Sequence, residues 1–166
     1  MNKLLIAITL LPYSLNASDI TEAFSYAQTT QAAYETATEY CLKQRKTEVS
    51  LTSTELNLLA KIPYSEAIVP YLEQRAFLKC VSETKLNYIE TLVLLEKLNA
   101  SVKNEEVSRF IRQQKEDNFH LIELEIKLDY MKLPLDVRER LESISSLHAP
   151  FDGVKLQELI WPALDN

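Results

Sequence analysis

The sequence predicts an all-α fold, an irregular up-and-down bundle of helices around a long central helix, held by one disulfide. Three observations support this prediction. Gly153 is the only glycine among 166 residues, whereas the tight turns of β-hairpins usually need glycine or asparagine at positive φ. Residues 71–98 carry apolar side chains at helical spacing on more than one face. The chain also contains two cysteines, Cys41 and Cys80.

Residues 71–98 are expected to form the central helix. At 100° per residue, its broad apolar face consists of Phe77, Cys80, Val81, Tyr88, Leu92, Leu95 and Leu98. A second, narrower apolar stripe on the far side consists of Leu86, Ile89 and Val93. A helix that is apolar on two sides is normally surrounded by other elements, so the remaining helices are expected to pack around this one.

Two local signals precede the central helix. Thr52 and Glu55 have the spacing of a capping box, which predicts a short helix through Ala60. Pro70 is expected near the first turn of the central helix, where the missing N–H of proline is tolerated. Residues 64–69 are therefore expected to form a separate turn of helix.

The sequence of the second half of the chain predicts three more helices, over residues 103–131, 134–147 and 154–161. Ser101 or Asn104 can cap the first of them, which is expected to run without a break. Pro134 stands at a typical first helical position, and Asp152 can cap the last helix.

The N-terminus has the layout of a secretory signal peptide, residues 1–17, followed by a single helical domain, residues 18–166. Lys3 supplies a positive start, residues 4–11 are apolar but for one threonine, and Ala17 offers a small residue for cleavage. The apolar run is too short to span a bilayer, and no later run reaches about 18 apolar residues. A periplasmic or secreted location is therefore expected.

The two cysteines are expected to form a structural disulfide. Cys41 falls on the apolar face of a first helix, residues 18–46, and Cys80 falls on the broad face of the central helix. An even number of cysteines in an exported chain favours a disulfide over free thiols. A redox-active pair would normally have C-x-x-C spacing, so this pair is interpreted as a staple between two helices.

Charge and glycine content argue against several functions. The formal net charge is −6 and there is no basic run, so binding to nucleic acid or to an anionic lipid surface is not expected. One glycine leaves no Gly-rich phosphate loop, dinucleotide fingerprint or nucleophile elbow. No C-x-x-C-H motif for covalent haem is present, and no cofactor is expected.

Polar side chains interrupt the apolar face of the predicted 103–131 helix. The apolar residues of that face are Val107, Phe110, Leu121, Leu124 and Leu128, and the polar residues on it are Gln114, Asp117, Asn118 and Glu125. Such a polar band can bind a ligand, a metal or a partner protein. It can equally be a stretch of helix that extends beyond its neighbours, or a buried polar network.

Two further patterns suggest sites but are incomplete. Asp117 and Glu116 stand three and four residues before His120, yet di-iron bundles use Glu-x-x-His on two helices, and His148 has no carboxylate three residues before it. No metal is therefore expected. Asn99 begins an N-x-S sequon for glycosylation.

The lack of a catalytic motif favours a non-catalytic exported protein that acts by binding another protein, as inhibitors, immunity proteins and chaperones do. The alternative is a small-ligand or metal carrier that uses the polar band, and an enzyme comes third. An apolar cavity beside Asp117 and Glu125 would favour the carrier, whereas an exposed apolar patch would favour the binder. A catalytic site would need His120 or His148 to meet carboxylates in a cleft.

Overall fold

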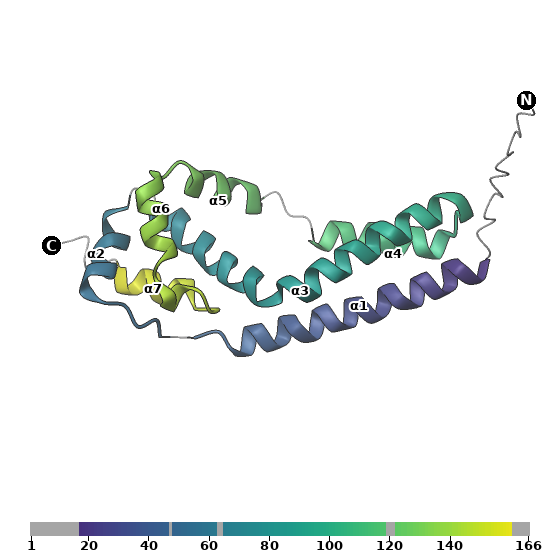
Figure 1. The fold of residues 1–166 in the computed structure, drawn as a ribbon, viewed down its shortest axis with the longest axis horizontal. Coiled ribbons are helices and arrows are strands. Elements are labelled where there is room, and N and C mark those ends of the chain that lie inside the picture. The colour runs from purple at the N-terminus through teal and green to yellow at the C-terminus, as the bar shows by residue number, and fades with distance from the viewer. Residues whose placement is uncertain (1–16, 47, 63–64, 119–121, 161–166) are drawn as a thin grey trace, which may run out of the picture.

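The computed structural model describes residues 17–46, 48–62, 65–118 and 122–160, and most of these residues lie in helices joined by short turns and loops (Figure 1). The helices are α1 (Ala17–Lys43), α2 (Ser53–Lys61), α3 (Ser65–Val102), α4 (Glu105–Asn118), α5 (Ile122–Met131), α6 (Leu135–Glu142) and α7 (Gly153–Ile160), with a 3-10 turn, η1 (Ser145–Leu147). Within these ranges no strand forms, and the single β-type contact is an isolated bridge between Lys46 and Phe151. The all-α prediction is confirmed. The predicted signal peptide lies almost wholly outside the described residues.

Helix α3 is the central helix, and it is longer than the sequence suggested. It contains 38 residues, and residues 65–69 belong to it rather than forming a separate turn. Pro70 lies inside α3. Because proline has no N–H, the carbonyl of residue 66 loses its helical hydrogen bond, and this single loss falls close to the start of the helix. Figure 1 shows that α3 bends near its middle, so its two halves diverge.

The bend divides the buried apolar residues into two clusters, one on each half of α3. The first cluster joins α2, the first half of α3, the end of α5, α6, η1 and α7, and includes Leu59, Ile68, Leu72, Leu141 and Leu156. The second joins α1, the second half of α3 and α4, and includes Ile20, Ala27, Leu95, Val107 and Ile111. The described residues therefore pack as two apolar cores on one shared helix rather than around a single central core.

The single helix predicted over residues 103–131 is wrong, because α4 ends at Asn118 and α5 begins at Ile122. Helix α5 packs in the first cluster and α4 packs in the second. Phe110 of α4 packs edge-on against Phe24 of α1, with ring centroids 5.1 Å apart. Tyr130 of α5 stacks on Tyr71 at the start of α3, at 4.2 Å. A straight helix could not reach both halves of the bent α3, so the chain uses two.

Two asparagines make the turn between α3 and α4. Lys103 has positive φ (57°), and its N–H donates to the Asn99 carbonyl at 2.7 Å. The buried Asn99 amide donates to the Asn104 carbonyl at 3.1 Å and to the Ser108 hydroxyl at 2.8 Å. Asn104 caps α4 by accepting from the Val107 N–H at 3.2 Å. Because its amide nitrogen is buried and donating, Asn99 is not a glycosylation site in the folded protein.

The other predicted caps are present. The Thr52 hydroxyl accepts from the Glu55 N–H at 3.3 Å, and the Thr52 N–H donates to the Glu55 carboxylate at 2.7 Å, so the capping box of α2 is complete. The N–H and the hydroxyl of Thr52 both donate to the Glu55 carboxylate, and these two hydrogen bonds lower the pKa of Glu55. Asp152 caps α7 by accepting from the N–H of Val154 at 3.0 Å and of Lys155 at 3.2 Å. None of the helices described here is long and apolar enough to cross a membrane.

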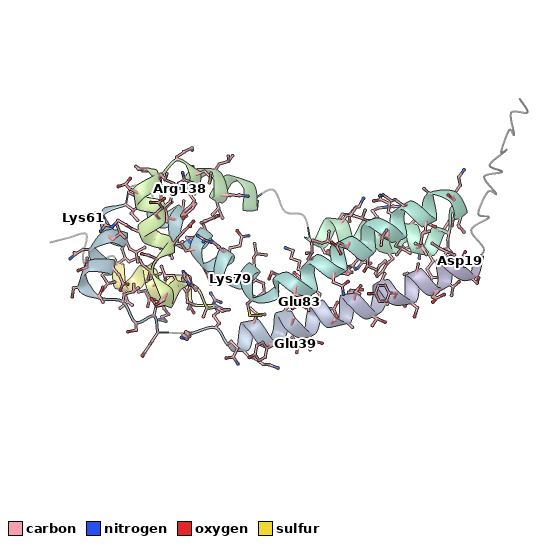
Figure 2. The ribbon with its side chains drawn as sticks, viewed as in Figure 1. Asp19, Glu39, Lys61, Lys79, Glu83 and Arg138 are labelled. Atoms are coloured by element: carbon pink, nitrogen blue, oxygen red, sulfur yellow. A yellow bond between two sulfur atoms is a disulfide. The ribbon has the colours of Figure 1, made fainter. Side chains whose placement is uncertain are left out.

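The disulfide joins Cys41 at the end of α1 to Cys80 in α3, with Cα atoms 6.1 Å apart. Neither cysteine is free. Figure 2 places this bond near the bend of α3, between the labelled residues Lys79 and Glu83. The staple therefore fixes α1 to α3 where the two cores meet.

Candidate binding groove between α1 and α4

The structure separates the residues of the predicted polar band. Gln114 is buried and Asp117 is exposed, and both lie in the last turns of α4. Asn118 ends α4, and Glu125 belongs to α5; their side chains lie outside the described part of the structure, as does His120. Gln114 and Asp117 thus come together beside residues of α1.

A groove of about 570 Å³ runs between α1 and α4 and contains both residues. Its lining residues come from three helices: Gln31, Tyr34, Glu35, Thr38 and Glu39 of α1, Tyr88 of α3, and Gln113, Gln114 and Asp117 of α4. This volume is within the range of about 300–1,000 Å³ that is typical of ligand sites.

Two stacked tyrosines line the inner side of the groove. The rings of Tyr34 and Tyr88 lie 5.8 Å apart at 20°. Tyr88 is buried, and its hydroxyl donates to the Gln114 side-chain oxygen at 2.6 Å. Burial, followed by the negative charges of Glu35 and Asp117, raises the pKa of Tyr88. The phenol therefore stays protonated, and Gln114 stands on an apolar face because it accepts a hydrogen bond from a buried hydroxyl.

The groove is negatively charged. Three carboxylates line it, those of Glu35, Glu39 and Asp117, and none of its lining residues is basic. Gln31 donates to Glu35 at 2.8 Å, and Lys43 lies 3.8 Å from Glu39 on the exposed side of α1. The groove is therefore suited to a cationic group with hydrogen-bond donors, because the carboxylates and side-chain amides offer several acceptors.

The carboxylates of the groove are not arranged as a metal centre. In the described ranges, no three His, Cys, Asp or Glu side chains are grouped closely enough to hold a metal ion. His148, the histidine whose side chain is described, donates from Nε2 to the Glu142 carbonyl at 2.7 Å. That carbonyl can only accept, so this bond fixes the tautomer of His148.

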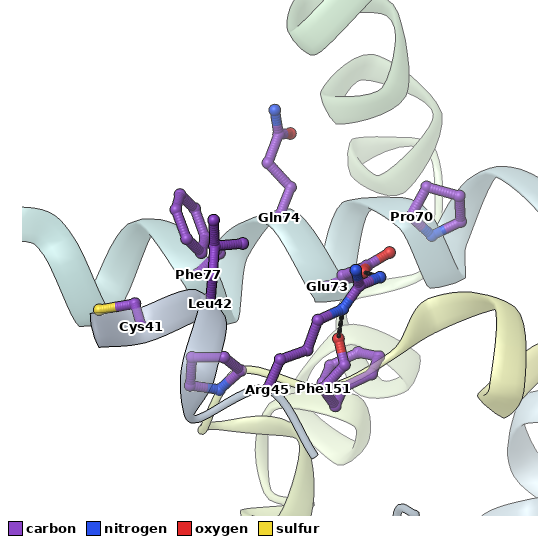
Figure 3. Close-up of a pocket in the computed structure, with 9 residues that line it drawn as sticks. Cys41, Leu42, Arg45, Pro70, Glu73, Gln74, Phe77 and Phe151 are labelled. Atoms are coloured by element: carbon purple, nitrogen blue, oxygen red, sulfur yellow. Dashed lines mark hydrogen bonds and ion pairs between the residues drawn. The ribbon is translucent and has the colours of Figure 1, made fainter. Parts of the chain in front are cut away.

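A second cavity, of about 230 Å³, lies at the junction of the two cores. Its walls are mainly apolar, and they include Cys41, Leu42, Pro70, Phe77, Pro150 and Phe151. Figure 3 shows Arg45 extending from the chain after α1 toward Glu73 of α3. Arg45 Nε donates to the Phe151 carbonyl at 3.1 Å, and its guanidinium forms an ion pair with Glu73. The guanidinium is thus occupied within the protein, and the cavity is smaller than typical ligand sites.

The sequence did not reveal the residues that α1 contributes to the groove. Glu35 and Glu39 are spaced as an ordinary exposed helix face, and only the packing of α4 beside them turns that face into one wall of a groove. Tyr34 and Tyr88 were the available signal, because each falls on an apolar helix face and a buried tyrosine hydroxyl needs a partner.

No protein-family model matches this chain, and neither the curated proteins nor the solved structures contain a significant match to it. The geometry of the groove and of the surface is therefore the basis on which a function can be proposed.

Proposed function

We propose that this protein is exported and acts, without catalysing a reaction, by binding another protein through the groove between α1 and α4. The observation that carries the proposal is the composition of the groove: three carboxylates and three glutamine amides beside a stacked tyrosine pair, with no basic side chain in the lining. This chemistry selects a partner that presents lysine or arginine side chains.

Export is supported by the disulfide, because structural disulfides persist in oxidising compartments and are rare in the cytosol. The N-terminal pattern of residues 1–17 supports the same compartment. Together they support the proposal that the partner is found outside the cytosol.

The carrier alternative is supported less well. The apolar cavity lies at Cys41 and Phe151, at the junction of the two cores, and its lining does not include Asp117. The groove beside Asp117 is polar, so a carried ligand would have to be a small organic cation rather than an apolar molecule. A titration with a short aliphatic diamine tests this alternative directly.

Capture from an extract of the native compartment tests the main proposal. Wild type is compared with the double variant Glu35→Gln/Asp117→Asn, which keeps the shape of both side chains and removes both charges. We expect captured partner to decrease about tenfold or more, since losing a charged contact at an interface costs on the order of 1–3 kcal/mol.

Glu116→Gln is the matched control, because Glu116 is exposed, adjacent to Asp117 and not part of the groove lining. It should capture the partner as wild type does. Equal capture by wild type, the double variant and the control would show that the groove is not the binding surface. Saturable diamine binding without a protein partner would favour the carrier instead.

A further inference from the structure

The outer face of the second half of α3 carries exposed apolar side chains beside two opposite charges. Leu86 is 59% exposed, Val93 44% and Leu94 60%, on the side of the helix that faces away from Leu95 and the second core. Glu90 and Lys97 are exposed on the same side. We call these five residues the α3 ridge.

The two charges of the ridge have no evident role within the protein. Neither Glu90 nor Lys97 forms an ion pair with any described residue, whereas neighbouring Glu96 binds Lys115 at 2.7 Å. Helical ion pairs join residues three or four positions apart, and every residue at those distances from Glu90 or Lys97 is uncharged. These charges are therefore available to a partner.

The spacing of the ridge is self-complementary. Glu90 stands three residues before Val93, and Lys97 stands three residues after Leu94. If a second α3 lies antiparallel across the first, with a twofold axis between Val93 and Leu94, each Val93 meets Leu94 of the second copy. Each Glu90 then lies beside Lys97 of the second copy, so the interface contains two such ion pairs, as twofold symmetry requires.

We propose that the α3 ridge binds a second copy of this chain in this antiparallel arrangement. Leu86 then faces Ser101 of the second copy, a small residue that leaves room for its side chain. A parallel arrangement would bring Glu90 against Glu90, and like charges facing each other oppose association. The ridge thus specifies both the partner and its direction.

The expected association is weak. A contact along one helix buries less than the roughly 1,200–2,000 Å² of a stable interface, so the dimer should form at high protein concentration and dissociate on dilution. It also leaves the groove free, because Tyr88 lies on the opposite face of α3 from the ridge at 100° per residue. Self-association is therefore independent of the proposed function.

Sedimentation of the full disulfide-bonded chain over a range of concentrations tests the proposal. Glu90→Lys and Lys97→Glu should each weaken dimerisation about tenfold or more, because two favourable pairs become two like-charged ones. The double variant Glu90→Lys/Lys97→Glu should restore dimerisation, since it exchanges the two charges. Wild type and the double variant should not associate with each other.

Two further variants control for position. Leu94→Glu should abolish dimerisation, whereas Leu128→Glu, an equally drastic change at an exposed site on α5, should not, and circular dichroism confirms that each variant folds. A wild type that stays monomeric at all concentrations overturns the proposal. So does a dimer that ignores all the ridge variants, or one that the charge exchange does not restore.

Discussion

Gly153, the only glycine of the chain, lies at a close approach between α7 and a side chain of α3 rather than at a turn that needs positive φ. Its φ is not positive, and a Cβ added there would collide with the Glu73 carboxylate. That carboxylate pairs with Arg45, which also donates to the carbonyl of Phe151. One residue without a side chain thus lets α7 start against α3 while this ion pair stays in place.

Gly153→Ala should therefore lower the free energy of unfolding by up to about 1 kcal/mol, because Glu73 must leave its position beside Arg45 in a partly exposed ion pair. Chemical denaturation measures this loss. In a Glu73→Ala background, the same substitution has space and should cost much less, so a double-mutant cycle should show coupling. If Gly153→Ala lowered the free energy of unfolding equally in both backgrounds, the clash with the Glu73 side chain would be contradicted.

Tyr130 provides a pH-dependent test at the residue scale. Burial, followed by its hydrogen bond to Glu142 at 3.0 Å, raises the pKa of Tyr130 from 10.0 to about 12. The folded protein thus favours the protonated phenol, and this contribution to stability is complete below pH 10 and is lost as the pH rises toward 12. Tyr130→Phe should lose less stability over that interval than wild type, whereas Tyr26→Phe, at an exposed site, should behave as wild type.

Among the helices, the side-chain caps are the signals that the sequence predicts correctly. The capping box of Thr52 and Glu55, the cap at Asp152 and the cap at Asn104 each depend on neighbours in the chain, so the structure confirms them. The break between α4 and α5 was missed. Helical periodicity continues through residues 103–131, and nothing local shows that α3 bends.

The same limit applies to the groove. Gln114 and Asp117 were identified because they interrupt an apolar face, but their partners on α1 are more than 70 residues away in the chain. Glu125 was grouped with them on the assumption of one straight helix. Tertiary packing brings Gln114 and Asp117 beside α1, and the spacing of residues along one predicted helix cannot describe that contact.

The turn between α3 and α4 gives a prediction at this scale. Asn99→Ala removes buried hydrogen bonds to Asn104 and Ser108 and should lower the free energy of unfolding by about 2–3 kcal/mol. Ser101→Ala, at an exposed position in the same turn, should change it by a few tenths of a kcal/mol. Thermal unfolding of the two variants side by side provides the measurement, and similar losses would contradict the role given to Asn99.

For the whole molecule, the disulfide is the main covalent constraint. It joins residues 39 positions apart, and loop-closure entropy suggests a stabilisation of about 4 kcal/mol. Reduction, or substitution of both cysteines by serine, should lower the melting temperature accordingly. Wild type that is denatured without reduction should contain no titratable thiol. Two titratable thiols would contradict the disulfide between Cys41 and Cys80.

The predicted export is tested by the mass of the protein recovered from its native compartment. We expect loss of residues 1–17, within a residue or two, because Ala17 offers the cleavage site. Recovery of a cytosolic chain that retains Met1 would contradict both the export and the compartment of the proposed partner.

The buried amide of Asn99 has a consequence for how the protein can be produced. A eukaryotic secretory pathway adds glycans to chains that have not yet folded, and the Asn99 sequon is then accessible. A bulky glycan on the nitrogen that donates to Asn104 and Ser108 cannot fit in the finished turn, so a glycosylated chain would keep α4 away from α3. Bacterial production should give one homogeneous species. Yeast or mammalian secretion should give a mixture in which the heavier, glycosylated fraction is more easily cut by proteases at α4.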